Sequence, residues 1–596
     1  MLDFKQNRLT YSDLLASPSK DFELTHAIGT TYSLDLLALL AIPVAMFYNR
    51  SLDGDFSKTR FDVLEAIRKS KERVTVFCQR GKIHQPDSYS TLLAFIENCI
   101  VEVLPDDDRS SFHPKIWVLR FAGKRKVIYR MAVLSRNLTF DRSWDISYFA
   151  EGSPQPNQKT ASGERLVAFL KHFYVKTGQQ MDRKIARELG TVDFDFPADF
   201  NSSAIFPIIG GSMNADFPNP VYATGFDELL VVSPFVDDPS LNELVSRNEK
   251  VVLFSREEEL DKLDKALLAD IEPFYFNNAV RDGEHTIDSE STQAAYQDLH
   301  AKFYIGRRKN LTSWYLGSAN ATAPAKDRNT EFLIKLNAKS QRASYEAMIE
   351  QLLNEQSRVF LPYQRSLRTI EPEEERLDQL LRRLNYKLSA AVYKGRVIER
   401  PDQQNFNLSL SVDLSSMTFN TRVTLSVALI HRSEPAFNLN AGTLNEWFFE
   451  NIAMTHLSHF LSVEIAVDGR SECRIVVKAD IKNMPAERDD VIFNELFNNK
   501  QSFYKYLQFL LAPDEYDGLM DLIGESTVDD NVTGGRDGQA KEFSPPIYEY
   551  LLLAASRSPL KLKEINQVMI RLERMNSEIV SDFKPVWDVF KQFAND

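Results

Sequence analysis

One short polar pattern occurs twice in this sequence, and the repeat constrains the fold more than any other feature. Each copy has a histidine and, two residues later, a lysine, followed further on by a serine and, two residues later, an asparagine. The first copy comprises His113, Lys115, Ser135 and Asn137, and the second comprises His300, Lys302, Ser318 and Asn320. A single His-x-Lys is uninformative, but the ordered set occurring twice predicts two related half-domains.

The spacing within each pattern has a structural meaning. Residues 115–119 and 302–305 are β-branched or aromatic runs that predict strands. Residues two apart on a strand point to the same face, so the histidine and lysine of each copy emerge together. Each half therefore presents an imidazole, an ammonium, an amide and a hydroxyl at one spot. Such a set suits a phosphate, because cations and amides stabilise its oxygens while an imidazole attacks phosphorus.

The segments around the two patterns predict the same order of elements. The first half has strand-like runs at 74–78, 115–119 and 127–134 and a helix-like run at 90–99. The second has strand-like runs at 229–232, 251–254, 302–305 and 313–316. Helical spacing at 162–189 and a Pro, Asn and Gly-rich connecting segment at 196–220 separate them. We therefore expect half-domains at residues 1–195 and 196–370.

The rest of the chain carries no catalytic pattern. Residues 341–393 read as mainly helical, with breaks near Pro362 and Pro372. From residue 405 apolar residues alternate, which predicts an antiparallel β module and gives a unit of helical linker plus β module at 371–488. A helical C-terminal region follows at 489–596, with a Gly, Asp and Thr-rich stretch at 526–544 that we expect to be mobile. A substrate-selecting or partner-binding role is the natural hypothesis for this part.

Composition narrows the class of protein. The chain has 596 residues and a formal net charge of -13, which argues against binding nucleic acid over its whole surface but leaves room for a local basic groove. Basic clusters at 124–126, together with Arg130, and at 307–309 are either phosphate contacts or solvated hairpin tips. Three cysteines without paired spacing argue against disulfides and a zinc site. Without a membrane-length apolar run or a signal-peptide core at 1–20, we expect a cytoplasmic protein with no membrane contact.

The patterned segments resemble the phospholipase D superfamily over residues 22–337. The resemblance implies an α/β fold: a duplicated phospholipase D-like α/β/α sandwich with mixed sheets, here followed by the β-rich module and the helical C-terminal region. It also implies phosphodiester cleavage without metal or cofactor, through a phosphohistidine. The implied roles are nucleophile for His113, acid for His300, phosphate binders for Lys115, Lys302, Asn137 and Asn320, and supports for Ser135 and Ser318.

In that family an acidic residue after the asparagine orients the histidine of its site. Glu331 fits this place in the second half, whereas Asp145 and Glu151 are both candidates in the first. Two features depart from the family pattern. Leu134 replaces a usual glycine, and Arg120 and Arg307 stand where an aspartate is common. The second departure resembles the tyrosyl-DNA phosphodiesterase and restriction-endonuclease branches.

These observations favour a nuclease that acts on DNA, an endonuclease of the restriction or antiviral defence type. A separately encoded partner such as a helicase or methyltransferase would fit that role. Two alternatives stay open. One is a phospholipase or phosphatidyl transferase, and the other is a catalytically weak phosphate-binding scaffold in a defence or repair complex.

Overall fold

A computed structural model describes most of the chain up to residue 496 and scattered positions beyond it. The described residues are 14–19, 21–40, 42, 70, 73–86, 89–139, 143–156, 158–213, 215–277, 298–354, 358–364, 372–400, 405–418, 422–431, 436–496, 504, 507, 551–552, 562, 565–566, 569–570, 572–573 and 577–591. The stretch 526–544, which we expected to be mobile, lies outside them.

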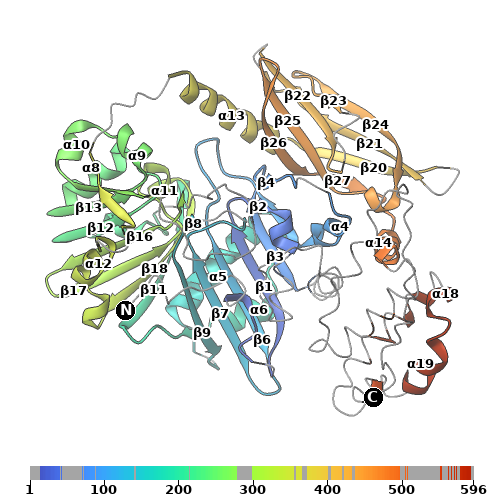
Figure 1. Cartoon of the computed structure of the whole chain (residues 1–596), viewed down its shortest axis with the longest axis horizontal. Coiled ribbons are helices and arrows are strands. Elements are labelled where there is room, and N and C mark those ends of the chain that lie inside the picture. Colours follow the sequence, from blue (N-terminus) through green and yellow to red (C-terminus); the bar gives the residue numbers. More distant parts are fainter. Residues whose placement is uncertain are drawn as a thin grey trace, which may run out of the picture.

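The first half is built on a seven-stranded mixed sheet in the order β10-β9-β7-β6-β1-β3-β5 (Figure 1). Its strands are β1 (Glu23–Thr31), β3 (Val74–Gln79), β5 (Ile100–Val103), β6 (Ile116–Ala122), β7 (Val127–Leu134), β9 (Ser147–Pro154) and β10 (Val192–Phe194). The three predicted strands of this half, β3, β6 and β7, are confirmed. The central strand β1, which pairs with both β3 and β6, was not predicted.

The second half repeats this plan in an eight-stranded sheet, ordered β11-β18-β17-β16-β12-β13-β14-β19. Its strands are β11 (Phe200–Ile209), β12 (Glu228–Val232), β13 (Lys250–Ser255), β14 (Glu272–Phe276), β16 (Phe303–Arg308), β17 (Leu311–Gly317), β18 (Thr330–Ala338) and β19 (Phe360–Pro362). In both sheets the strand after the His-x-Lys pattern lies antiparallel between two neighbours, β6 between β1 and β7 and β16 between β12 and β17. The protein is thus a mixed α/β structure with two sheets of matching plan.

The prediction of a connecting segment over 196–220 was wrong for its first part. Strand β11 occupies residues 200–209 and pairs along the whole of β18. Pro207 lies within it and lacks a backbone N–H, but β11 is an edge strand, where a missing donor is tolerated. The proline therefore marked an edge strand rather than a loop.

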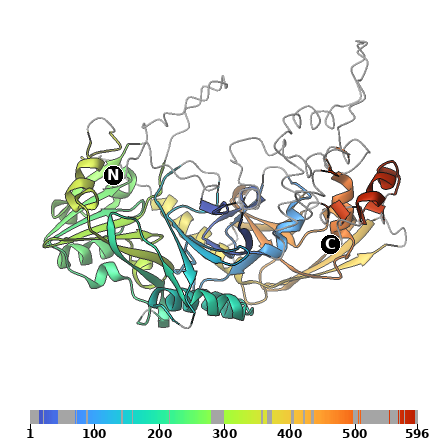
Figure 2. The ribbon, with the colours of Figure 1, turned by 90° about the horizontal axis from the view of Figure 1, so that it is seen from below.

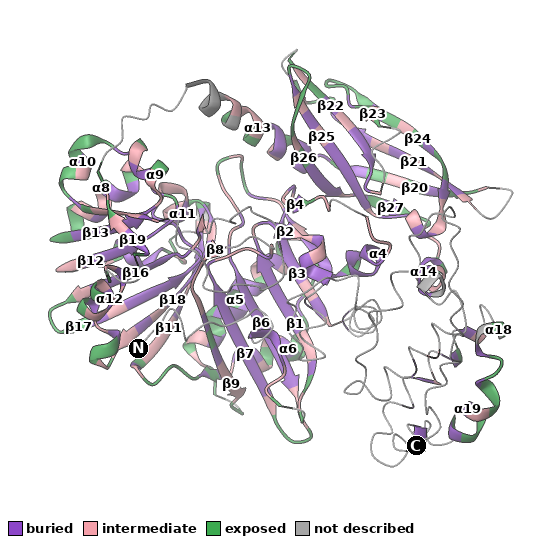
Figure 3. Cartoon of the chain, viewed as in Figure 1, coloured by how far each residue is buried: buried purple, intermediate pink, exposed green. Residues whose placement is uncertain are grey.

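Helices cover the sheets. α5 (Ala161–Lys176) and α6 (Arg183–Leu189) form the helical run that was predicted at 162–189. Buried apolar residues of α5 pack in a core that contains residues of both sheets. The others are α4 (Leu93–Ile96), α7 (Pro220–Ala223), α8 (Asp238–Arg247), α9 (Glu257–Lys262), α10 (Lys265–Ala269), α11 (Ala323–Asp327), α12 (Tyr345–Leu352), α13 (Pro372–Ala390), α14 (Arg488–Leu496), α18 (Ser577–Val580) and α19 (Lys584–Phe590). Figure 3 shows buried residues concentrated on the strands of both sheets. No helix among the described residues is long and apolar enough to span a membrane.

In the region where we predicted an antiparallel β module, the structure has two sheets around one core. Their strands pair antiparallel within the module except for the short strand Asp480–Lys482, which lies parallel to its neighbour. A four-stranded sheet has the order β24-β21-β20-β27, and a six-stranded sheet has the order β2-β4-β26-β25-β22-β23. The strands are β20 (Tyr393–Glu399), β21 (Asn405–Asp413), β22 (Val423–Leu429), β23 (Phe437–Asn438), β24 (Leu444–Ala453), β25 (Phe460–Val467), β26 (Arg470–Lys478) and β27 (Asp480–Lys482). The six-stranded sheet ends in β4 (Ile83–His84) and β2 (Leu34–Asp35), which belong to the first half.

Buried charges also join this module to the first half, which lies between it and the second half (Figures 1 and 2). The Glu97 carboxylate is fully buried and pairs with Arg488 at 3.0 Å. Ser458 donates a hydrogen bond to the same carboxylate, and Lys478 donates to the backbone oxygens of Glu97 and Ile100 at 2.6 and 3.0 Å. Separating the module from the first half would leave these buried charges without their partners, which costs free energy. The contact therefore stabilises the observed position of the module.

Candidate active site

Both copies of the polar pattern meet at the seam between the two sheets. The His113 amide donates to the Thr330 carbonyl oxygen at 2.8 Å, and the Thr330 amide donates to Ser111 at 2.8 Å. On the other side the His300 amide donates to the Trp144 carbonyl oxygen at 2.8 Å, where β15 (Asp298–Leu299) pairs with β8 (Ser143–Trp144). Each histidine is thus held by backbone of the opposite half, and the two halves form one site.

The serines align the two halves residue by residue. The Ser318 hydroxyl accepts a hydrogen bond from the Phe332 amide at 3.0 Å, and the Ser135 hydroxyl accepts one from the Ile146 amide at 2.9 Å. Both serines are buried at the end of a strand. The residue before Phe332 is Glu331, so the residue before Ile146, Asp145, holds the equivalent place in the first half.

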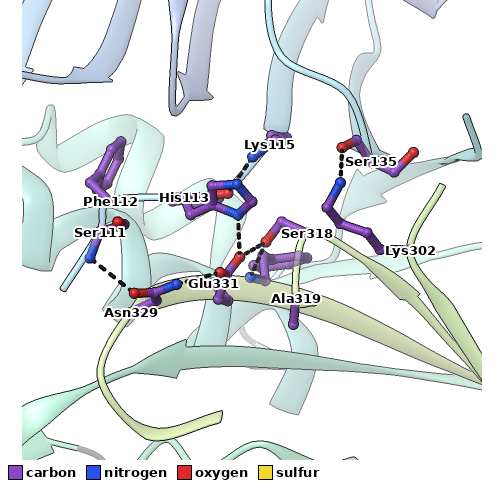
Figure 4. A network of polar contacts seen from close by, with 12 residues as sticks. Ser111, Phe112, His113, Lys115, Ser135, Lys302, Ser318, Ala319, Asn329 and Glu331 are labelled. Atoms are coloured by element: carbon purple, nitrogen blue, oxygen red, sulfur yellow. Dashed lines mark hydrogen bonds and ion pairs between the residues drawn. The ribbon is translucent and has the colours of Figure 1, made fainter. Parts of the chain in front are cut away.

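Glu331 reaches across the seam to the histidine of the other half. Its Oε2 lies 2.9 Å from His113 Nδ1, and the carboxylate is fully buried (Figure 4). Ser318 donates to the same oxygen, and Asn329 Nδ2 donates to Oε1 at 3.1 Å. A carboxylate that accepts from Nδ1–H fixes the ring orientation and leaves the Nε2 lone pair available. Glu331 is therefore placed to orient a histidine, and that histidine belongs to the opposite half.

The first-half carboxylates have other partners. Asp145 Oδ2 lies 3.6 Å from Arg136 Nε. Glu151 pairs with Arg130 on the neighbouring strand, where Arg130 also donates to the carbonyl oxygen of Ala16 at 2.7 Å. Of the two candidates that the sequence left open, Asp145 takes the place equivalent to Glu331, and Glu151 belongs to a strand-packing contact.

Two buried ammonium groups lie beside the histidines. Lys115 Nζ donates to the His113 carbonyl oxygen at 2.9 Å, and Lys302 Nζ donates to those of His300 at 2.8 Å and Ser135 at 3.3 Å. Burial lowers the pKa of Lys302 to about 7, with Glu331 opposing this effect. Burial likewise holds the pKa of Lys115 well below its usual value. An anion bound here would favour the charged form of both lysines.

Burial also keeps the histidines neutral in the free protein. It lowers the pKa of His113 to about 4, although the nearby Glu331 carboxylate acts in the opposite direction. The pKa of His300 falls to about 2, first through burial and then through the positive charges of Lys302 and Arg256. The two histidines thus differ in their neighbours, with an anion beside one and cations beside the other.

The two asparagines of the pattern behave alike. Asn137 and Asn320 each follow the serine of their half by two residues, at the same end of β7 and β17. In each, the side-chain oxygen is buried and has no hydrogen-bond partner among the described residues. Buried polar atoms are normally satisfied, so this pair marks a place shaped for a polar ligand.

The basic clusters and the two arginines of the sequence pattern lie elsewhere. Residues 124–126 form the exposed hairpin tip between β6 and β7, at the end of β6 away from His113. Arg120 pairs with Glu188 at 2.7 Å, and Arg307 pairs with Glu228 across β16 and β12. These side chains stabilise the sheets rather than line the site.

Sequence reasoning missed two residues of this site. Arg256, at the end of β13, donates to Asp298 at 2.6 Å and to the Leu299 carbonyl oxygen at 2.9 Å, directly before His300. Tyr32, after β1, has its ring centroid 5.1 Å from that of His113. Neither belongs to a repeated pattern, and only the pairing of distant strands places them here.

Comparison with known proteins gives weak similarities only. No family model and no curated protein matches this sequence. A yeast tyrosyl-DNA phosphodiesterase structure is 12% identical with a TM-score of 0.35, and the match covers 57% of this chain and 87% of that one. For a polyphosphate kinase from Porphyromonas gingivalis the values are 10%, 0.32, 63% and 50%. For a phosphatidylserine synthase from Haemophilus influenzae they are 12%, 0.33, 63% and 97%. Similarities this low establish no activity or substrate for this chain.

Proposed function

We propose that this chain is a phosphodiesterase of the phospholipase D superfamily that cleaves DNA through a covalent phosphohistidine. The observation that carries the proposal is the single seam site, in which two histidines, two buried lysines and two asparagines converge and Glu331 orients His113. An imidazole with a fixed tautomer is a competent nucleophile, and the surrounding donors suit the charge that develops on a phosphoryl group.

The first chemical step assigns a role to each histidine. His113 Nε2 attacks phosphorus while its Nδ1–H stays bonded to Glu331, so that a P–N bond forms and the P–O bond to the leaving group breaks. His300 donates its proton to the departing oxygen. Lys115 and Lys302, with the two asparagine amides, stabilise the nonbridging oxygens. This division follows the bond between His113 Nδ1 and the Glu331 carboxylate.

The second step reverses the proton flow. His300, now neutral, takes a proton from water as the water oxygen attacks phosphorus, and the P–N bond breaks to restore His113. In the free protein both rings favour the neutral form, so His300 must gain its proton when substrate binds. The negative charge of a phosphodiester next to the ring raises the pKa of His300 and supplies this coupling.

The choice of DNA rests on the sequence. Arginines stand at positions 120 and 307 in place of the aspartates common in the family, a departure that resembles its nuclease branches. A restriction or antiviral defence role, with a separately encoded helicase or methyltransferase, belongs to the same proposal. Phospholipid is the rival substrate and is included in the test.

The test compares wild-type protein with His113→Ala on labelled single- and double-stranded DNA in excess EDTA. Acid-labile, alkali-stable label on the quenched protein reports the phosphohistidine. We expect cleavage and labelling by the wild type and neither by the variant. Hydrolysis of phosphatidylglycerol vesicles without DNA cleavage would replace DNA by lipid, and DNA cleavage that survives in His113→Ala would refute the site.

A further inference from the structure

The mouth of the site can be compared position by position in the two halves. At the end of β1, Thr31 Oγ1 donates to the Ser33 carbonyl oxygen at 2.7 Å and accepts from the Leu138 amide at 3.0 Å. After β12, Ser233 Oγ donates to the Phe235 carbonyl oxygen at 2.6 Å and accepts from the Ala321 amide at 2.9 Å. The two loops are therefore equivalent, and Tyr32 of the first half corresponds to Pro234 of the second.

The segments that follow β3 and β13 differ in charge. The chain after β3 turns at Gly81 and continues through Lys82 into β4. The chain after β13 instead enters α9, which opens with three glutamates at 257–259. The segment after β3 thus carries a lysine where the segment after β13, beyond Arg256, carries glutamates, although the sheets have the same plan.

Lys82 lies beside the aromatic ring that contacts the proposed nucleophile. Its ammonium is 5.5 Å from the centroid of the Tyr32 ring, and the Lys115 ammonium is 5.9 Å from the same centroid. That ring is also in contact with the imidazole of His113. Within the part of the chain that the structure describes, the Lys82 ammonium has no hydrogen bond or ion pair, and its side chain is half-buried.

The β module and α13 hold the backbone of this lysine in place. The Lys82 carbonyl oxygen accepts from Leu34, and the following residue, Ile83, pairs with β2 and with Val476 of β26. Gly81 has a φ of +74°, and a Cβ there would lie 1.9 Å from Ser389 Oγ on α13. The backbone that presents Lys82 is therefore fixed from both sides, by the β module and by α13.

We propose that Lys82 and Tyr32 form a subsite for the phosphate that neighbours the scissile one, on the His113 side. The proposal rests on the proposed function and narrows its substrate to a chain with more than one phosphate, a polynucleotide strand. Lys115 binds the scissile phosphate, and Lys82, beside the same aromatic ring, binds the next one. The leaving group then extends toward the second half.

The test measures kcat/KM for a short single-stranded oligonucleotide and for a nucleoside 4-nitrophenyl phosphodiester, which has one phosphate. In Lys82→Gln we expect the ratio of the two constants to fall about tenfold, mainly through KM for the oligonucleotide. The slope of log kcat/KM against log salt should become shallower by about one for the oligonucleotide. Lys124→Gln, at the exposed hairpin tip, is the matched control and should change neither quantity.

An unchanged ratio in Lys82→Gln, or an equal loss on both substrates, overturns the subsite. Binding of a labelled oligonucleotide to His113→Ala and to His113→Ala/Lys82→Gln, followed by anisotropy, separates this result from failure of the proposed function. Wild-type protein that cuts no DNA refutes the function. Equal affinity of the two variants refutes the subsite, whatever the activity.

Discussion

The two halves of the site share a backbone plan but surround their histidines with different charges. In the second half the acid after the asparagine is Glu331, fully buried and bonded to His113. In the first half the equivalent acid is the shorter Asp145, which lies 3.6 Å from Arg136, and the place of Arg136 is taken in the second half by the buried Ala319. The shared backbone plan supplies the geometry, and different residues at a few positions make the surroundings of the two histidines chemically distinct.

The largest effect should come from the histidines themselves. We expect His113→Ala to lower kcat/KM by about 10⁴-fold on any phosphodiester, because the variant lacks the imidazole that forms the covalent bond in the proposed mechanism. His300→Ala should lose a similar factor on DNA but much less on a 4-nitrophenyl diester, whose leaving group needs no proton. Rates on the two substrates measure this. If the 4-nitrophenyl diester restored the rate of His113→Ala instead of that of His300→Ala, the two roles would be reversed.

The next largest effect should be a difference between the two carboxylates, Glu331 and Asp145, in the loss of activity on substitution. Glu331→Gln keeps the size of the side chain but offers an amide to His113, so the ring can lose its fixed tautomer, and we expect kcat to fall by about 10²–10³-fold. Asp145→Asn should cost less than tenfold, because Asp145 lies beside Arg136. Steady-state kcat values test this pair. Equal losses in both variants would mean that the two halves are functionally symmetric.

Stability at low pH tests the burial of both rings. The folded-state pKa values of His113 and His300 are lowered below the usual 6.5, so the unfolded chain binds more protons than the folded one. The free energy of unfolding should therefore fall as pH drops from about 6.5 to 4, by about 1.4 kcal/mol per pH unit for each ring. Denaturant melts of the wild type, His113→Asn and His300→Asn measure the slope. Each variant should flatten it, and parallel slopes would contradict the assignment.

The smallest effect concerns Arg256, whose charge lowers the pKa of His300. Arg256→Gln should raise that pKa. The high-pH limb of the plot of kcat against pH, where the acid loses its proton, should therefore shift to higher pH by about half a unit. Arg247→Gln, an exposed arginine on α8, serves as the control. A shift to lower pH, or the same shift in both variants, would show that Arg256 does not act through His300.

Much of the site was readable in the sequence because its signals are local. The His-x-Lys and Ser-x-Asn spacings describe residues on one strand face, and the same period gave the strands β6, β7, β16 and β17 and those of the β module. The edge strand β11 and the central strand β1 were missed. The first contains a proline, and the second, with Gly29 packed against the Trp117 ring, lacks a regular apolar alternation.

By itself the sequence determined that a histidine, a lysine, a serine and an asparagine come in two matching sets. Only the tertiary structure decided that Glu331 binds His113 rather than the histidine of its own half. It also decided that Lys82 lies beside Tyr32, next to a sheet that the first half shares with the β module. The physical reason is that side-chain period is fixed by neighbours along one strand. Pairing across the seam depends instead on how separate sheets pack, which no local spacing encodes.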